Sequence, residues 1–367
     1  MTTVFVLSFA VACAASLVLV GVARRVFTRI GFVDRPGHRK IHAAPVPYGG
    51  GAAIFATVLL TVASGMTLVV LRNAAPVVRL PVADMLQTHA GGILSRCGPL
   101  VGLLVATTML FVIGLIDDRR RLSAWPKLLV QFIAAGIVVW GLGIQATFFV
   151  PVPWIGQVAT LFWIVAITNA FNFLDNMDGL SAGVAAIALV VLAGVTAAAG
   201  QVFVPVLAVV LLGALVGFLA YNFPPASIFL GDAGSLTVGF LIAVLTVLGE
   251  YYRPETGRSL FSPFLPLVVL AVPLYDLTSV TLIRIARGKS PFVGDTNHFS
   301  HRLVALGLSR RAAVLTVYLA TLTTSLGAVM LRGAGTLEAV IIFVQTLAIL
   351  AVIAIFERIA GARALRP

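Results

Sequence analysis

Long apolar runs recur along the whole chain and are separated by short polar segments. Each run is close to the roughly 20 residues that a helix needs to cross the hydrocarbon core of a bilayer. The pattern predicts an all-α, polytopic integral membrane protein with about eleven transmembrane helices, or ten if one weak run is not a span. The predicted helices cover residues 4–23, 50–71, 99–116, 127–143, 155–171, 180–199, 202–221, 234–249, 263–284, 312–331 and 337–356.

The composition sharpens this prediction. Of the 367 residues, 60% are hydrophobic and 10% are charged, whereas soluble domains carry about 25% charged residues. These values exclude a soluble domain, a disordered chain and a disulfide-rich secreted module. We therefore expect residues 1–367 to form a single membrane-embedded domain.

The net charge of +12 arises from 25 Lys and Arg residues against 13 Asp and Glu residues. If the N-terminus lies outside, 19 of the 25 cations fall in segments that face the cytoplasm, which is the bias of the positive-inside rule. The surplus thus indicates orientation, with a cytoplasmic C-terminus, rather than a nucleic-acid partner. The expected location is the cell membrane (plasma or inner membrane).

The acidic residues gather beside these cations. Eight of the thirteen are aspartates at or near the inner helix ends. Ionisable groups in a bilayer usually mark function, and carboxylate oxygens suit Mg²⁺ bound together with substrate phosphates. The grouping predicts phosphoryl chemistry at the cytoplasmic face, although helix capping explains any single loop aspartate equally well. These aspartates are Asp34, Asp117, Asp118, Asp175, Asp178, Asp232, Asp276 and Asp295.

Five polar segments carry the candidate chemistry. Asp117 and Asp118 end the third predicted span, where both carboxylates can reach a common cation. The asparagine-rich run that starts at Asn169 is expected to line a cavity, because it would be costly facing lipid. Phe229 could stack on a base, and the helix N-terminus after it offers N–H groups to an anion. The segments are about 24–49, 117–127, 169–181, 222–235 and 285–311.

The first and last of these segments are rich in cations. His298 and His301 have a spacing that permits zinc, but the adjacent Arg302 favours contact with a phosphate or pyrophosphate. An ordinary surface loop is the alternative. The cations of the first segment, which would gather anionic lipid headgroups or a phosphorylated lipid, are Arg39, Lys40 and His42.

Taken in order, the five segments resemble the polyprenyl-phosphate N-acetylhexosamine-1-phosphate transferases, a group of glycosyltransferase family 4. The phospho-N-acetylmuramoyl-pentapeptide transferases of peptidoglycan synthesis are the sister branch. The resemblance runs from Asp34 to about Gly307. It rests on DRPGHRKIHAAPVPYGGG, LIDDRRRLSAWPKLLVQ, NFLDNMDGLSAG, NFPPASIFLGDAGS and DTNHFSHRL.

The resemblance implies a reaction and its partners. The family transfers a sugar-1-phosphate from a UDP-sugar to polyprenyl phosphate in the lipid bilayer. The reaction uses Mg²⁺, for which Mn²⁺ can substitute, and gives a polyprenyl-diphospho-sugar and UMP. The implied role is the first membrane step of cell-envelope glycan synthesis, with N-acetylglucosamine (GlcNAc) as the expected sugar.

The resemblance also implies residue roles. Asp117 and Asp118 match adjacent aspartates associated with Mg²⁺ and with deprotonating the lipid phosphate, and Asp232 matches a magnesium-binding aspartate. Asp175, a catalytic candidate, and Asp178 match an acidic pair near the nucleotide. The further matches to substrate-binding positions are Lys127, Asn172, Asn222, Phe229, Gly231, Asp276, His298, His301 and Arg302.

One position departs from the family pattern. The last motif usually reads His-x-His-His, but Ser300 replaces its middle histidine and carries no positive charge. The replacement puts donor preference or diphosphate contact in question. Arg302 and Leu303 favour the GlcNAc branch, with the muramoyl-pentapeptide donor as the alternative. A secondary transporter is a remote alternative, and a homodimer and a covalent intermediate remain open.

Overall fold

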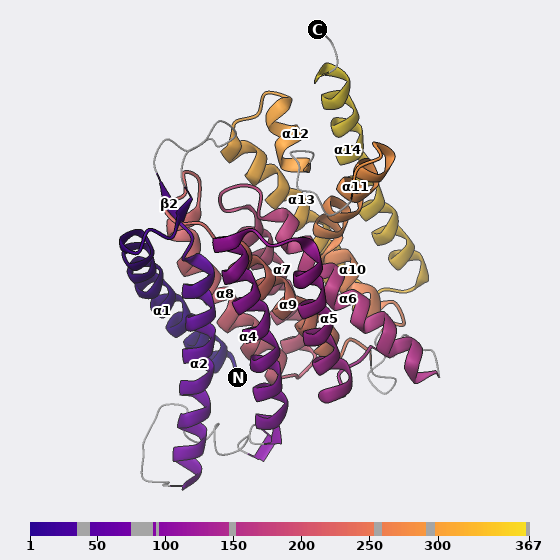
Figure 1. The fold of residues 1–367 in the computed structure, drawn as a ribbon. Coiled ribbons are helices and arrows are strands. Elements are labelled where there is room, and N and C mark those ends of the chain that lie inside the picture. Colours follow the sequence, from indigo (N-terminus) through magenta and orange to yellow (C-terminus); the bar gives the residue numbers. More distant parts are fainter. Residues whose placement is uncertain are drawn as a thin grey trace.

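The computed structural model describes residues 1–34, 45–74, 91–92, 95–146, 152–252, 259–290 and 298–364. Within these ranges the chain is a bundle of helices with one small two-stranded sheet (Figure 1). The elements are α1 Thr2–Arg29, β1 Val33–Asp34, β2 Val46–Pro47, α2 Gly50–Ala74, α4 Cys97–Arg120, α5 Ala124–Gly136, η1 Ile137–Gly141, α6 Pro153–Leu174, α7 Leu180–Ala198, α8 Phe203–Asn222, α9 Gly231–Leu248, η3 Ser262–Phe264, α10 Leu265–Val269, α11 Ala271–Ala286, α12 Phe299–Ala305, α13 Arg310–Met330 and α14 Thr336–Ala364.

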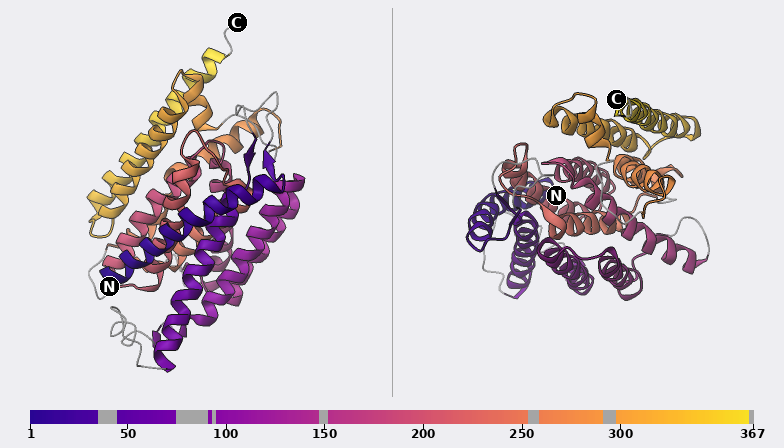
Figure 2. Two further views of the ribbon diagram at one scale, coloured as in Figure 1. Left: turned by 90° about the vertical axis from the view of Figure 1, so that its left-hand side faces the viewer. Right: turned by 45° about the horizontal axis from the view of Figure 1, so that its top comes forward.

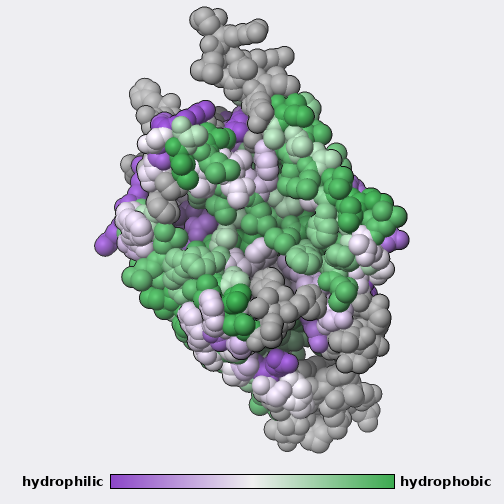
Figure 3. Space-filling model, turned by 90° about the vertical axis from the view of Figure 1, so that its right-hand side faces the viewer, coloured by the Kyte–Doolittle hydropathy of each residue, from purple (hydrophilic) through white to green (hydrophobic). Residues whose placement is uncertain are grey.

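The predicted all-α membrane architecture is confirmed. In the part of the chain that the structure describes, ten helices are long and apolar enough to cross a membrane, or eleven if one bent pair is counted as a span. Each predicted apolar run coincides with one of them. Apolar residues form a broad band across the face shown in Figure 3, as expected for a surface that contacts lipid.

The bundle is layered around α9. Helices α1 and α2 lie at one edge and α14 lies at the other (Figures 1 and 2), while most of α9 is buried among α2, α4, α6, α7 and α8. Helix α9 is apolar on all sides, as is typical of a helix that is surrounded by other helices. The first turn of α9 is therefore surrounded by protein, and it contains the acidic Asp232.

The ninth predicted span is not one straight helix. It divides at Leu270 into a short first part, η3 and α10, and the longer α11, with a bend of 59°. Pro273 explains the break, because proline has no N–H to donate to the carbonyl of Val269 and its ring displaces that carbonyl. The apolar run indicated the span but not its bend.

Glycines allow α9 to approach its neighbours closely. A side chain at Gly51 of α2 would meet the backbone of Gly234 at 2.2 Å, and one at Gly114 of α4 would meet the backbone of Ala233 at 2.5 Å. These contacts hold the start of α9 against the first turn of α2 and the last two turns of α4. The aspartates at the end of α4 and the start of α9 are thereby brought together.

The small sheet closes the same end of the bundle. Val33 and Asp34 pair in antiparallel fashion with Pro47 and Val46. The chain then continues to Tyr48, which bridges to Phe229 in the loop between α8 and α9. Three segments that are distant in sequence therefore meet at this end. The predicted lipid-phosphate residues Arg39, Lys40 and His42, and also Asp295, lie outside the described residues.

Candidate active site

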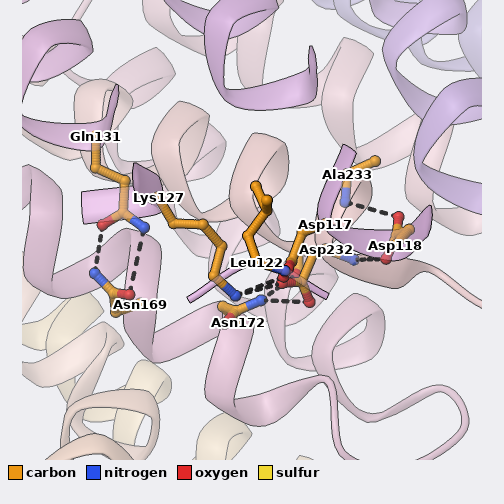
Figure 4. Close-up of polar contacts among 10 residues, drawn as sticks. Asp117, Asp118, Leu122, Lys127, Gln131, Asn169, Asn172, Asp232 and Ala233 are labelled. Carbon is orange, nitrogen blue, oxygen red and sulfur yellow. Dashed lines mark hydrogen bonds and ion pairs between the residues drawn. The ribbon is translucent and has the colours of Figure 1, made fainter. Parts of the chain in front are cut away.

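Four polar side chains from four helices converge where the bundle is closed by the sheet (Figure 4). Asp117 lies in the last turn of α4 and Lys127 in the first turn of α5. Asn172 lies in the last turn of α6 and Asp232 in the first turn of α9. Because successive helices run in opposite directions, the C-terminal ends of α4 and α6 meet the N-terminal ends of α5 and α9.

Lys127 joins the two carboxylates of this cluster. Its Nζ lies 2.6 Å from Oδ2 of Asp117 and 2.9 Å from Oδ2 of Asp232. The backbone N–H of Leu122 donates to the other oxygen of Asp117. The lysine side chain is 20% exposed and the two aspartate side chains are 10% and 28% exposed, so the cluster is partly open. Two acidic groups thus share one ammonium in a site of reduced dielectric.

Asn172 orients Asp232 from a third side. Its Nδ2 donates to Oδ1 of Asp232 at 3.0 Å and to Oγ of Ser235 at 2.9 Å. Both oxygens of Asp232 therefore have a donor, one from Lys127 and one from Asn172. The prediction that Asn172, Lys127 and Asp232 belong to one site agrees with this geometry.

Asp118 faces a different set of groups from its neighbour Asp117. Its Oδ1 accepts a hydrogen bond of 2.7 Å from the N–H of Asp232, and its Oδ2 accepts one of 3.2 Å from the N–H of Ala233. Two of the N–H groups that the start of α9 was expected to offer to an anion thus bind a carboxylate of the protein itself. Asp118 reaches the backbone of α9, whereas Asp117 reaches Lys127.

Asp175 and Asp178 lie in the loop between α6 and α7. Burial raises the pKa of Asp175 well above its ordinary value, and the charges of Asp232, Asp118 and Asp178 raise it further, while a hydrogen bond from the backbone of Gly231 opposes the rise. Asp178 accepts a hydrogen bond of 3.0 Å from the N–H of Ala226, which lies in the loop between α8 and α9. Asp175 is thus a carboxyl group suited to holding a proton.

The loop between α8 and α9 is held by its own polar groups. The buried side chain of Asn222 accepts from the N–H of Gly179 and donates to the carbonyl of Ile228, each at 2.8 Å. The ring of Phe229 packs at a tilt against Tyr48, with 5.9 Å between centroids. Asn222 shapes the loop from within, whereas Phe229 is only partly buried and remains a candidate for base stacking.

Asp276 and the start of α12 form a second polar group. Nδ1 of His298 lies 2.9 Å from Oδ2 of Asp276, and the N–H of Phe299 donates to Oδ1 of Asp276 at 3.0 Å. The rings of His298 and Phe173 are nearly perpendicular, in an edge-to-face arrangement, and Phe173 is the neighbour of Asn172 in the chain. The His298 and His301 rings are 6.3 Å apart. The structure thus brings the histidine segment to the site end of the bundle.

Ser300, the residue that departs from the family pattern, joins α12 to the loop between α6 and α7. Oγ of the buried Ser300 donates to Oδ1 of Asn176 at 2.5 Å, and Asn176 in turn donates to the carbonyl of Phe173 at 2.7 Å. The serine therefore attaches α12 to the α6–α7 loop. Arg302 is partly buried on α12, one residue beyond His301.

One part of the site was missed by the sequence analysis. Nδ2 of Asn169 donates to Oε1 of Gln131 at 2.5 Å, and Gln131 is almost fully buried between α5 and α6 (Figure 4). Gln131 lies one turn after Lys127, and Asn169 lies about one turn before Asn172, so the amide pair joins the two helices that carry site residues. A glutamine inside an apolar helix was the available signal.

A divalent cation would find two carboxylates here. No group of three or more His, Cys, Asp or Glu side chains in the described ranges is arranged to hold a metal ion. Mg²⁺ in enzymes commonly uses one or two carboxylates and takes its remaining ligands from substrate phosphates and water. Asp117 and Asp232, which already converge on one ammonium, fit that pattern.

One cavity lies away from this site. It has a volume of about 370 Å³ and lies at the opposite end of α6 and α9, between Trp163, Thr246, Tyr251 and Phe264. It contains no cluster of acids and cations. The candidate active site is therefore defined by the polar side chains rather than by this cavity.

Comparisons with known proteins agree with this assignment. Residues 100–250 match the model of glycosyl transferase family 4. The chain is 34% identical to the "Probable undecaprenyl-phosphate N-acetylglucosaminyl 1-phosphate transferase" of Bacillus subtilis (strain 168), over 90% of this chain and 85% of that protein.

Two further relatives are a "Decaprenyl-phosphate N-acetylglucosaminephosphotransferase" of Mycobacterium tuberculosis (strain ATCC 25618 / H37Rv) and an "Undecaprenyl-phosphate alpha-N-acetylglucosaminyl 1-phosphate transferase" of Escherichia coli (strain K12). The first is 33% identical over 82% of this chain and 75% of that protein. The second is 28% identical over 83% of this chain and 78% of that protein. The chain therefore belongs to glycosyl transferase family 4, together with these N-acetylglucosaminyl 1-phosphate transferases.

Proposed function

We propose that this protein transfers GlcNAc-1-phosphate from UDP-GlcNAc to a polyprenyl phosphate, forming polyprenyl-diphospho-GlcNAc and releasing UMP. The observation that carries the proposal is the convergence of Asp117, Lys127, Asn172 and Asp232 at one end of an apolar helix bundle. A soluble nucleotide sugar and a lipid phosphate can meet at such a place. The names of the relatives support the sugar and the acceptor.

The proposed reaction is a phosphoryl transfer. An oxygen of the lipid phosphate attacks the phosphorus that carries the sugar, and the bond from that phosphorus to the oxygen of the UMP leaving group breaks. Both reactants are anionic, so the reaction depends on positive charge placed against the phosphates. Lys127 supplies one such charge, and its two carboxylate partners hold it at the site end of α5.

We assign Mg²⁺ binding to Asp117 and Asp232, with Mn²⁺ as a substitute. The bound ion would supply charge neutralisation on the phosphates. The ammonium of Lys127 lies between the two carboxylates, which supports their use as ligands for a cation. Asn172 holds Asp232 in the orientation that such a ligand needs.

Asp175 is the proposed proton acceptor for the lipid phosphate. Its raised pKa brings the carboxyl group towards the range in which a general base works efficiently. The backbone of Gly231 donates to it, which fixes it beside the first turn of α9. His298, whose ring is oriented by Asp276, is proposed to contact the diphosphate, together with His301 and Arg302.

We further propose that this end of the bundle faces the cytoplasm. The cations that the positive-inside rule places in the cytoplasm flank the polar cluster, for example Arg119 and Arg120 at the end of α4 and Arg310 at the start of α13. A UDP-sugar is a soluble cytoplasmic substrate. The protein would then act at the inner face of the cell membrane, with its C-terminus inside.

The test compares two donors side by side. Membranes that contain the folded protein are supplied with polyprenyl phosphate, Mg²⁺ and either radiolabelled UDP-GlcNAc or radiolabelled UDP-N-acetylmuramoyl-pentapeptide. We expect labelled lipid and stoichiometric UMP with UDP-GlcNAc, and much less of both products with the Asp232→Asn variant. Labelled lipid from the muramoyl donor alone would reassign the substrate. Substrate uptake without UMP release would instead indicate a transporter.

A further inference from the structure

Asp117 and Asp118 are adjacent in sequence, but their carboxylates contact different parts of the protein. Both side chains lie in the last turn of α4, where successive residues point about 100° apart around the helix axis. Asp117 binds Lys127 and the N–H of Leu122. Asp118 accepts hydrogen bonds from two backbone N–H groups, those of Asp232 and Ala233 (Figure 4).

The partners of Asp118 are the amides that most need an acceptor. The first four N–H groups of a helix have no carbonyl partner within the helix. Leu230, the residue before α9, provides no side-chain cap. A carboxylate that accepts from two such amides makes charge-assisted hydrogen bonds and also faces the positive end of the helix dipole. Asp118 therefore caps α9 from another helix.

The backbone around this contact is shaped to admit the carboxylate. Gly231 has φ of 71°, which is left-handed, and a Cβ there would meet Oδ2 of Asp118 at 2.6 Å. Gly114, one turn before Asp118 on α4, approaches the backbone of Asp232 and Ala233 so closely that a Cβ would meet it at 2.5 Å. Two glycines thus keep space for a carboxylate at the start of α9.

We propose that Asp118 is a positioning residue that acts through the backbone of α9. By binding the N–H of Asp232 it fixes the point from which the Asp232 side chain projects towards Lys127 and Asn172. In this role Asp118 neither binds the metal ion nor takes a proton. Its importance for catalysis rests on the proposed function, but the capping itself does not.

Hydrogen exchange tests the capping without any substrate or metal. Deuterium uptake is measured on the purified full-length protein in detergent micelles, with EDTA and without donor or acceptor, using overlapping peptides that cover residues 225–240. In Asp118→Ala, the amides of Asp232 and Ala233 should exchange about tenfold faster or more, because two charge-assisted hydrogen bonds are lost. The matched control Asp117→Ala removes the neighbouring charge and should leave exchange at these amides within about twofold of wild type.

The isosteric variant Asp118→Asn decides the outcome if the alanine variant does not fold. Its side chain keeps one acceptor, so one of the two amides should remain protected and the other should exchange faster. Unchanged exchange at both amides would overturn the proposal, as would equal acceleration in Asp117→Asn. Because no reaction takes place in this experiment, a failure of the proposed transferase activity would not change its result.

A kinetic comparison separates positioning from metal binding. Asp118→Asn should lower kcat, and it should raise the Mg²⁺ concentration for half-maximal activity by less than Asp232→Asn does, because it disturbs a ligand without removing it. Asp232→Asn should raise that concentration about tenfold or more, because a direct ligand is lost, and adding Asp118→Asn to it should cause no further rise, because Asp118 acts through Asp232. A further rise of about tenfold in the double variant would assign Asp118 to the metal and contradict the proposal.

Discussion

Replacement of Lys127 by methionine is the sharpest perturbation of the site. Methionine keeps most of the length and apolar surface of the lysine side chain but removes the ammonium that lies 2.6 Å from Asp117 and 2.9 Å from Asp232. The two carboxylates are then left without their common cation. The side chain is only 20% exposed, so water compensates for a minor part of the loss.

The expected size of the effect follows from these contacts. Removing one partner of a buried, hydrogen-bonded charge pair typically costs about 3–5 kcal/mol. Loss of a single charge-stabilising donor in an active site lowers kcat by about 10²–10³. We therefore expect kcat of Lys127→Met to fall about 10²–10³-fold, which corresponds to about 3–4 kcal/mol in the activation free energy.

The assay measures UMP release and labelled lipid at saturating UDP-GlcNAc. The matched control is Lys289→Met, which removes an exposed lysine after the end of α11 and should leave kcat within about twofold of wild type. Affinity for Mg²⁺ should not fall in Lys127→Met, because the ammonium competes with a divalent cation for the same two carboxylates. A kcat within threefold of wild type would refute the assignment of Lys127 to the reacting phosphates.

Three further predictions follow from the same geometry. Removal of divalent cations with EDTA should abolish transfer, and added Mg²⁺ or Mn²⁺ should restore it; full activity in EDTA would contradict the metal assignment. Gly231→Ala should lower kcat about tenfold or more, because φ of Gly231 is 71° and the new Cβ would meet the carboxylate of Asp118. The control Gly333→Ala should leave kcat unchanged, because the space around Gly333 is open. The pKa of Asp175 is raised, and its charged form is the proposed proton acceptor. Activity should therefore fall as the pH drops through a value above the ordinary carboxylate pKa of about 4. If the same loss of activity at low pH persists in Asp175→Asn, the titrating group is not Asp175.

The membrane architecture could be predicted from the sequence because hydrophobic runs of bilayer length have one structural solution. The bend at Leu270 was also encoded, in Pro273, but a proline in an apolar run does not reveal whether the helix kinks or ends. The closeness of Asp117 and Lys127 follows from their short separation along the chain. Their contact with Asp232, more than 100 residues away, depends on how three helices pack.

The roles of individual polar residues were harder to predict. Adjacent aspartates look equivalent in a sequence, yet the rotation between them sends Asp117 to Lys127 and Asp118 to the backbone of α9. Gln131 was overlooked although the quoted segment LIDDRRRLSAWPKLLVQ ends at it. A buried amide in an apolar helix needs a partner, which proves to be Asn169. Only the packed structure shows which backbone N–H groups lack an acceptor of their own.

In the proposed reaction one phosphate moves together with the sugar, and a labelling experiment tests this transfer directly. UDP-GlcNAc that carries ³²P only in the phosphate next to the sugar is incubated with the purified protein, polyprenyl phosphate and Mg²⁺. We predict that the label appears in the lipid diphosphate and that the released UMP is unlabelled. Label that stays in a released nucleotide diphosphate while the sugar moves to the lipid would contradict it.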